Sequence, residues 1–357
     1  MTNTSSSIAF LFPGQGSQAV GMGKELAANH AVARQTFDEA DEALGYKLSE
    51  LCFEGPEEKL KLTEITQPAI LTASVAAWRV LQEKGLKPEA ATTFVAGHSL
   101  GEYSAHVAAG TLTFADAVRT VRNRGKYMQE AVPVGVGAMA AILGMPLEQV
   151  VAIASEAAQG EVCQAANINS PEQVVISGNA GAVGRAIQLA TERGAKKAVS
   201  LPVSAPFHCA LMQPAQDRLA VDLRALAFNN PAFPVVCNVD ATPVTSGEAA
   251  RDALIRQVTG AVRWEESVRT LIAKGASLFI EVGPGKVLWG LMRQIDRSKT
   301  CLSVGDEASL AKTLEKVGDQ VSGLGLRSWV SGLGSTFLLF CKWAIGSVRP
   351  TLSTDRP

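Results

Sequence analysis

The segment Thr93-Phe-Val-Ala-Gly-His-Ser-Leu-Gly101 carries the most specific structural pattern in this sequence. An apolar run over 93–97 predicts a strand, and it leads directly through the pattern G-x-S-x-G into an alanine-rich segment that predicts a helix. The two glycines let the backbone turn sharply, so the hydroxyl of Ser99 should stand exposed at the end of the strand. The amide of Leu100 would then lie at the helix start, where free N–H groups can stabilise an oxyanion. The pattern therefore predicts a nucleophilic serine, with a plain tight turn as the alternative.

Segments on either side of this elbow alternate between strand and helix patterns. The apolar run Ile8–Phe12 predicts a buried strand, and a helical region follows it to about residue 85. A helix is predicted over Phe114–Ala131, and the apolar runs 234–239 and 277–282 predict further strands. Strands that alternate with helices are typical of α/β folds with a parallel sheet. We therefore predict a large α/β domain.

Residues 135–203 follow a different order. Their patterns predict β-α-β-β-α-β, with strands at 138–143, 164–168, 173–177 and 197–203, helices at 147–158 and 183–193, and a turn at 169–171. This is the order of the ferredoxin-like unit. We expect a small domain over 135–203, inserted into a catalytic domain formed by 1–134 and 204–316.

The segment 317–357 differs from the rest in composition. Gly323, Gly325, Gly332 and Gly334 interrupt any helical period, and the apolar patch over 337–345 is too short to span a bilayer. We expect this tail to be poorly ordered and to lie outside the working fold. The alternative is an appended segment that packs on the surface or binds a partner.

Composition excludes several classes of function. Apolar residues make up 47% and charged residues 19% of the 357 residues, and the formal net charge of −1 gives no bulk attraction for nucleic acid or an anionic membrane. Six cysteines are scattered without metal-ligand spacing, which favours a reduced protein with inert thiols and no metal site. The N-terminus does not resemble a signal peptide, and no run reaches the ~18 apolar residues of a membrane helix. We expect a cytoplasmic protein.

A nucleophilic serine needs a base, and the chain has only four histidines: His30, His98, His106 and His208. The side chain of His98 should point away from its neighbour Ser99. His106 lies about 10 Å along the following helix, and His30 lies in a polar segment. Elimination leaves His208, which ends the segment 202–208, where Pro202 and Pro206 restrict the backbone. A purely structural loop histidine is the alternative.

The order of these residues does not fit an ordinary α/β-hydrolase. That fold runs Ser, Asp, His with a late histidine, whereas 149 residues follow His208 and Asp116 is the only aspartate between Ser99 and His208. The group that orients the imidazole is therefore open, and a backbone carbonyl is one candidate.

Arg124 lies on the wrong face of its predicted helix. It shares the inward stripe of Ala117, Val121 and Met128. An inward guanidinium needs a carboxylate partner, because an unpaired buried charge is costly. That partner is either a structural aspartate or glutamate, or the free carboxylate of a substrate.

Together these segments resemble the malonyl-CoA:acyl carrier protein transacylases of bacterial fatty acid synthesis. The resemblance rests on seven stretches that recur in order over roughly residues 8 to 316: Phe12-Pro-Gly-Gln-Gly-Ser-Gln18, Thr66-Gln-Pro-Ala69, Gly97-His-Ser-Leu-Gly-Glu102, Arg124-Gly-Lys-Tyr-Met-Gln129, Asn169-Ser-Pro171, Pro206-Phe-His208 and Glu281-Val-Gly-Pro-Gly-Lys286. It implies a hydrolase-like parallel-sheet domain with a ferredoxin-like small domain. Nothing in the tail 317–357 resembles the family.

The resemblance also implies roles for single residues. Ser99 would carry the malonyl ester, His208 would act as base and then acid, and the backbone carbonyl of Gln257 would orient it. Gln15 and the Leu100 amide would form the oxyanion hole. The expected substrate-binding side chains are Arg124, which would pair with the malonyl carboxylate, and Met128, Phe207 and Asn169. Phe207 is bulky and should favour malonyl over methylmalonyl.

A ping-pong transfer of this kind implies malonyl-CoA and acyl carrier protein as substrates. It needs neither a metal nor a bound cofactor, and we expect a monomer that binds no nucleic acid and no membrane. Three other readings remain. Gly14-Gln-Gly-Ser-Gln-Ala19 with Asp38 also fits a dinucleotide fingerprint, although Pro13 interrupts the required turn. The protein could instead be a hydrolase that releases free acid, or a non-catalytic subunit that docks the carrier protein.

Overall fold

The computed structural model describes residues 7–324, with side chains described up to Gly318. One six-stranded sheet has the order β10-β9-β1-β2-β7-β8. Its strands are β1 (Ser7–Phe12), β2 (Thr93–Gly97), β7 (Val235–Val236), β8 (Pro243–Val244), β9 (Ala276–Val282) and β10 (Thr300–Val304). All neighbours are parallel except β7 and β8, which pair antiparallel. The predicted parallel sheet is therefore confirmed.

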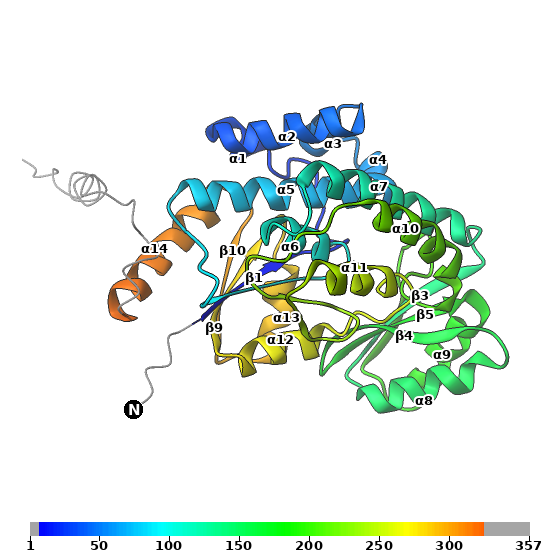
Figure 1. Cartoon of the computed structure of the whole chain (residues 1–357). Coiled ribbons are helices and arrows are strands. Elements are labelled where there is room, and N and C mark those ends of the chain that lie inside the picture. Colours follow the sequence, from blue (N-terminus) through cyan, green and yellow to red (C-terminus); the bar gives the residue numbers. More distant parts are fainter. Residues whose placement is uncertain (1–6, 325–357) are drawn as a thin grey trace, which may run out of the picture.

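Helices cover both faces of this sheet (Figure 1). They are α1 (Lys24–Asn29), α2 (Ala31–Leu44), α3 (Leu48–Glu54), α4 (Glu57–Leu60), α5 (Thr63–Glu83), α6 (Gly101–Ala108), α7 (Phe114–Ala131), α10 (Gln213–Ala225), α11 (Gly247–Arg256), α12 (Trp264–Ala273), α13 (Val287–Ile295) and α14 (Glu307–Leu324). Alternate residues of β1 face opposite layers, as the pleat requires. Phe10 packs with the core that includes α5 and α7, whereas Leu11 packs with Trp264 and the core formed by α12 and α13.

The second sheet is antiparallel and has the order β4-β5-β3-β6. Its elements in chain order are β3 (Gly137–Leu143), α8 (Leu147–Ala158), β4 (Cys163–Ser170), β5 (Gln173–Asn179), α9 (Ala180–Glu192) and β6 (Lys197–Ser200). Both helices cover one face of it, away from the large sheet (Figure 1). The alternation of strands and helices in this segment is the predicted ferredoxin-like order. The 3-10 turn Ala210–Met212 lies between β6 and α10, before the chain returns to the large sheet at β7.

The bounds of several strands differ from the sequence prediction, most clearly those of β4, β6 and β7. β4 continues through Asn169 and Ser170, where a turn was expected, and the turn falls at residues 171–172. β6 ends at Ser200 rather than 203, shortly before Pro202, which has no N–H for the ladder. β7 spans two residues instead of the expected 234–239. The backbone N–H of Asn238 donates to the carboxylate of Glu102, at 2.9 Å, rather than to a strand.

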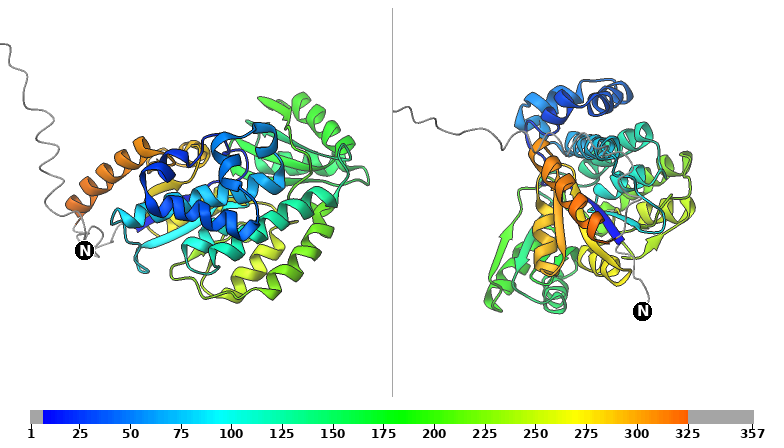
Figure 2. Two further views of the ribbon diagram at one scale, coloured as in Figure 1. Left: turned by 90° about the horizontal axis from the view of Figure 1, so that it is seen from above. Right: turned by 90° about the vertical axis from the view of Figure 1, so that its left-hand side faces the viewer.

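The expected boundary of the tail at residue 317 is wrong, because it falls inside α14. This helix continues to Leu324, and Val317 is buried in the core. α14 lies at the end of the large sheet that is remote from the small one (Figure 2). The rest of the expected tail, 325–357, lies outside the described residues. Within residues 7–324, no helix combines the length and apolar character needed to cross a membrane.

Candidate active site

The turn between β2 and α6 is built by glycines. A Cβ at Gly97 would collide with the backbone of Gly101, and a Cβ at Gly101 would collide with the carbonyl of Phe12 in the neighbouring strand. Between them Ser99 has a φ of +53°, in the left-handed region that a non-glycine residue adopts at a cost. This conformation presents the Ser99 hydroxyl to a pocket beyond the end of β2. The expected nucleophile elbow is therefore present in its geometry.

His208 is the histidine that reaches Ser99. Its Nε2 lies 2.7 Å from Ser99 Oγ, and its Nδ1 lies 3.0 Å from the carbonyl oxygen of Gln257 and 3.2 Å from that of Gly260. Since both neighbours of Nδ1 are acceptors, Nδ1 carries the proton and Nε2 can accept from the serine. Burial, and then the positive charge of Arg124, lower the pKa of His208 to about 3, so the ring is neutral at physiological pH.

Backbone carbonyls occupy the place of the acidic member of a triad. Among the described residues, no carboxylate lies within ion-pairing distance of His208. Gln257 is the first residue after α11, and its carbonyl points to the imidazole. The sequence alone suggested that a backbone carbonyl could orient the imidazole, but only the family resemblance indicated that of Gln257.

The other three histidines are held elsewhere. His30 is buried between α1 and α2, against the expectation of a purely polar setting, and its Nε2 lies 2.8 Å from Glu307 of α14. His106 is fully buried in α6. His98 Nε2 donates to Oδ1 of Asn169, at 2.8 Å, and burial lowers the pKa of His98. His98 therefore links the elbow to β4 of the small sheet.

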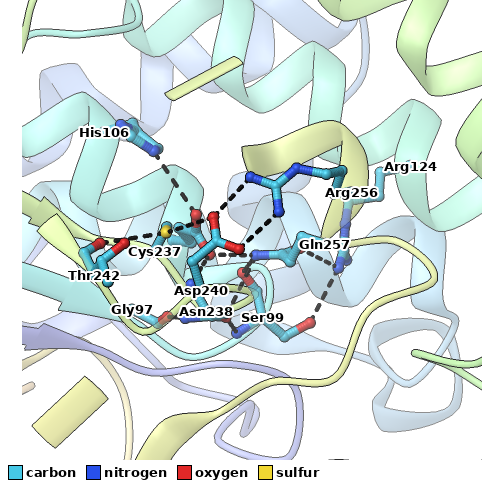
Figure 3. A network of polar contacts seen from close by, with 11 residues as sticks. Gly97, Ser99, His106, Arg124, Cys237, Asn238, Asp240, Thr242, Arg256 and Gln257 are labelled. Carbon is cyan, nitrogen blue, oxygen red and sulfur yellow. Dashed lines mark hydrogen bonds and ion pairs between the residues drawn. The ribbon is translucent and has the colours of Figure 1, made fainter. Parts of the chain in front are cut away.

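Arg124 projects from α7 into the same site and is only 2% exposed. Its Nη2 donates to Ser99 Oγ at 3.0 Å and to Gln257 Oε1 at 2.9 Å, and its Nη1 donates to Gln67 Oε1 at 2.7 Å. Figure 3 shows the guanidinium between Ser99 and Gln257. Within the described part of the chain, no carboxylate lies within 4.0 Å of it, and its Nε is buried without a hydrogen-bond partner. The structural acid that the sequence allowed as its partner is thus not there, and amide oxygens take its place.

A cavity of about 480 Å³ opens over Ser99. This volume is ordinary for a small-molecule site. The side chains that line it include every substrate-binding and oxyanion candidate from the sequence: Gln15, Leu100, Arg124, Met128, Asn169 and Phe207. They come from five different parts of the chain, among them the loops after β1 and β2 of the large sheet and strand β4 of the small one, so the fold brings the sequence candidates together. Asn169 already accepts from His98.

Sequence reasoning missed several residues of the site. Gln67 and Lys286 line the cavity, and each lay in a stretch quoted only for its resemblance. Asn238 carried no signal at all, yet its Oδ1 accepts from the Ser99 amide at 2.7 Å. The side chain of Gln257 was also missed, because only its backbone carbonyl was expected to matter. Gln67 meets Arg124 across 57 residues of chain, and Asn238 and Gln257 meet Ser99 across 139 and 158, so these contacts leave no local pattern.

Comparison with known proteins gives matches over most of the chain. The acyl transferase domain family matches residues 9–321. The malonyl CoA-acyl carrier protein transacylase of Escherichia coli (strain K12) is 52% identical over 307 residues, which cover 86% of this chain and 98% of that protein. The crystal structure of an acyl carrier protein S-malonyltransferase from Vibrio cholerae has a TM-score of 0.84 and 52% identity, and the match covers 86% of this chain and all of that one.

A further solved structure contains a second protein. It is a type II polyketide synthase acyl-carrier protein, AntF, in complex with its malonyl-transacylase, and the match has a TM-score of 0.84 and 50% identity over 87% of this chain and 100% of that one. The family model and the high identity over nearly the whole length of the relatives leave one assignment. The chain belongs to the acyl transferase family and, within it, to the malonyl CoA-acyl carrier protein transacylases.

Proposed function

We propose that this protein transfers the malonyl group of malonyl-CoA to the phosphopantetheine thiol of acyl carrier protein, through an ester on Ser99, and so supplies fatty acid synthesis. One observation carries the proposal. Ser99 Oγ lies 2.7 Å from a neutral imidazole and 3.0 Å from a guanidinium that has no carboxylate partner among the described residues. The first contact suits a nucleophile, and the second suits an acyl group that ends in a carboxylate.

The first half-reaction loads the enzyme. As Ser99 Oγ attacks the thioester carbonyl, its proton passes to His208 Nε2, while the other ring proton stays on Nδ1 and is hydrogen-bonded to the carbonyls of Gln257 and Gly260. The amide of Leu100 and the side chain of Gln15 are proposed to hold the oxyanion. The carbon–sulfur bond then breaks, coenzyme A leaves, and its sulfur takes the proton from His208. The products are the Ser99 ester and a free thiol.

Arg124 is proposed to hold the malonyl carboxylate during this step. The guanidinium fork can form two charge-assisted hydrogen bonds to a carboxylate. Binding of that anion would also offset the positive charge that lowers the pKa of His208. The basicity of His208 would therefore rise when a carboxylate-bearing acyl group is present. Met128, Phe207 and Asn169 would complete the acyl-binding wall of the cavity.

The second half-reaction reverses the first with a different thiol. The phosphopantetheine thiol of acyl carrier protein gives its proton to His208 and attacks the Ser99 ester, and Ser99 Oγ recovers the proton as it leaves. The solved complex of an acyl carrier protein with a 50% identical transacylase supports this class of partner.

We also propose how the protein is organised in the cell. Residues 1–134 and 204–316 would form one discontinuous catalytic domain and 135–203 a second, small domain, which agrees with the two separate sheets. The protein would act as a cytoplasmic monomer. Cys52, Cys163, Cys209, Cys237 and Cys301 are free thiols, as is usual in a reducing compartment. Light scattering of the purified protein tests the monomer, and a dimer mass would contradict it.

Mass spectrometry of the intact protein tests the function itself. Malonyl-CoA should add one malonyl group, located on the peptide that contains Ser99, and the Ser99→Ala variant should add none. Holo acyl carrier protein should then discharge the ester and gain the group. Labelling of another residue in Ser99→Ala would refute the assignment. Rapid release of free malonate without carrier protein would show a hydrolase instead.

A further inference from the structure

Glu102 is a buried carboxylate beside the site that the proposed mechanism does not use. It lies in the first turn of α6, three residues after Ser99, and is fully buried without lining the cavity. Its Oε2 accepts from the backbone N–H of Asn238 at 2.9 Å and from Nε2 of Gln257 at 2.8 Å. Its Oε1 is buried without a hydrogen-bond partner and lies 4.0 Å from Nε2 of His106. Burial lowers the pKa of His106 to about 3, so this ring is neutral.

Gln257 is the residue through which Glu102 reaches Arg124. Its Nε2 donates to Glu102 Oε2 and, at 2.9 Å, to the carbonyl of Ser99, while its Oε1 accepts from Arg124 Nη2 at 2.9 Å. An amide can occupy its place in two orientations. The other orientation would point an N–H at the guanidinium, which has only donors, and an oxygen at a carboxylate, which has only acceptors when ionised. Glu102, together with the carbonyl of Ser99, thus selects the orientation that Arg124 needs, and Glu102 is the side chain of this pair.

Asn238 forms a second branch of the same network. Its backbone N–H is held by Glu102, its Oδ1 accepts from the amide of Ser99 at 2.7 Å, and its Nδ2 donates to the carbonyl of Gly97 at 2.7 Å. Figure 3 shows Asn238 and Gln257 on either side of the strained Ser99 backbone. Glu102 therefore joins the loop after β7, the end of α11 and the elbow itself.

We propose that Glu102 is a positioning residue that sets the preference for carboxylate-bearing acyl groups, because its acceptor oxygen fixes the Gln257 amide with Oε1 toward Arg124. The inference rests on the proposed function, in which Arg124 holds the malonyl carboxylate. What matters is the acceptor rather than the charge. Burial raises the pKa of Glu102 to about 7, so both protonation states are accessible near neutral pH, and a carbonyl oxygen can accept the same two hydrogen bonds in either.

Three substitutions of Glu102 distinguish the roles of its acceptor oxygen, its negative charge and the length of its side chain. Glu102→Gln keeps the size and one acceptor oxygen but removes the charge. Glu102→Asp keeps the charge but withdraws it by one methylene from Gln257 and Asn238. Glu102→Leu removes both acceptors. The readout is the ratio of malonyl-Ser99 to acetyl-Ser99 formation, from single-turnover mass spectrometry with each thioester, since only the malonyl reaction depends on a well-placed Arg124.

The ratio should stay within about threefold of the parent in Glu102→Gln, fall in Glu102→Asp, and fall by roughly ten- to a hundredfold in Glu102→Leu, as expected for the loss of a hydrogen bond that orients a charged group. Asp41→Leu is the matched control. Asp41 is a buried carboxylate in α2 that accepts twice from Ser49 and does not line the cavity, so its loss should lower stability and leave the ratio unchanged.

Two results would overturn the inference. One is an equal loss of malonyl and acetyl loading in Glu102→Asp and Glu102→Leu, which would show a purely structural role. The other is a drop in Glu102→Gln as large as in Glu102→Asp, which would show that charge rather than the acceptor matters. If Glu102→Leu does not fold, the comparison of Glu102→Gln with Glu102→Asp still decides. A parent protein that forms no malonyl ester would instead refute the proposed function.

Discussion

Replacing Arg124 by alanine should separate malonyl transfer from acetyl transfer. The guanidinium is 2% exposed, and its Nη2 lies 3.0 Å from the nucleophile. Truncating one partner of a buried, hydrogen-bonded charge pair costs about 2–5 kcal/mol. This corresponds to a loss in kcat/KM for malonyl-CoA of roughly tens to thousands of fold. Acetyl-CoA has no carboxylate, so its kcat/KM should change by less than about tenfold.

The assay measures kcat/KM for both thioesters with the same holo acyl carrier protein. Arg124→Lys is a second variant, which keeps the charge but lacks the fork that contacts Gln67, Gln257 and Ser99 together, and it should fall between the parent and Arg124→Ala. Arg119→Ala on the same helix is the control, because Arg119 is exposed and pairs with Asp116. Equal losses for malonyl and acetyl, with a lower melting temperature, would refute the reasoning and make Arg124 a structural residue.

Two further predictions concern pH and the end of the chain. Burial, and after it the charge of Arg124, lower the pKa of His208 to about 3, and the base works only when neutral. The acid limb of kcat/KM for acetyl-CoA should therefore shift to higher pH in Arg124→Met, which removes the second of these causes. An acid limb at the same pH in parent and variant would contradict this. A chain ended at Leu324 should keep transfer activity and stability to urea, whereas one ended at Lys316 loses the buried side chain of Val317, about 1.5–3 kcal/mol. Loss of activity on ending the chain at Leu324 would show that the segment 325–357 is needed.

Local sequence patterns were sufficient to predict β2, which leads into the elbow, and α7, which carries Arg124. The predicted bounds of β2 and α7 are those of the structure, because an apolar strand ended by glycine and a periodic amphipathic helix both carry their limits in neighbouring residues. The β-α-β-β-α-β order of the small sheet and its helices could also be predicted, because each of these elements has a local strand or helix pattern. The inward direction of Arg124 also followed from helical spacing alone.

Polar contacts between distant parts of the chain could not be predicted from the sequence. After β7 the N–H of Cys237 donates to the carbonyl of Thr242, and that of Asn238 donates to Glu102. No pattern in residues 234–239 predicts this last partner, which lies 136 residues away. The tail boundary failed in a related way. The glycines after residue 323 suggested an earlier end of the fold, but Val317 packs into a core that the sequence could not place.

The partners of the Arg124 guanidinium in the structure differ from both partners that the sequence allowed. The helical spacing of α7 predicted that Arg124 points inward and therefore needs an anionic partner. The sequence allowed two such partners, a structural aspartate or glutamate and the carboxylate of a substrate. The structure supplies a third arrangement, in which the amide oxygens of Gln67 and Gln257 accept hydrogen bonds from the guanidinium without neutralising it. A structural carboxylate at that place would compete with the substrate for the same fork. Glu102 instead lies one step removed, behind the Gln257 amide that it orients. The site thus keeps the cation ordered and still able to gain from an incoming carboxylate, which is what selection of a malonyl group requires.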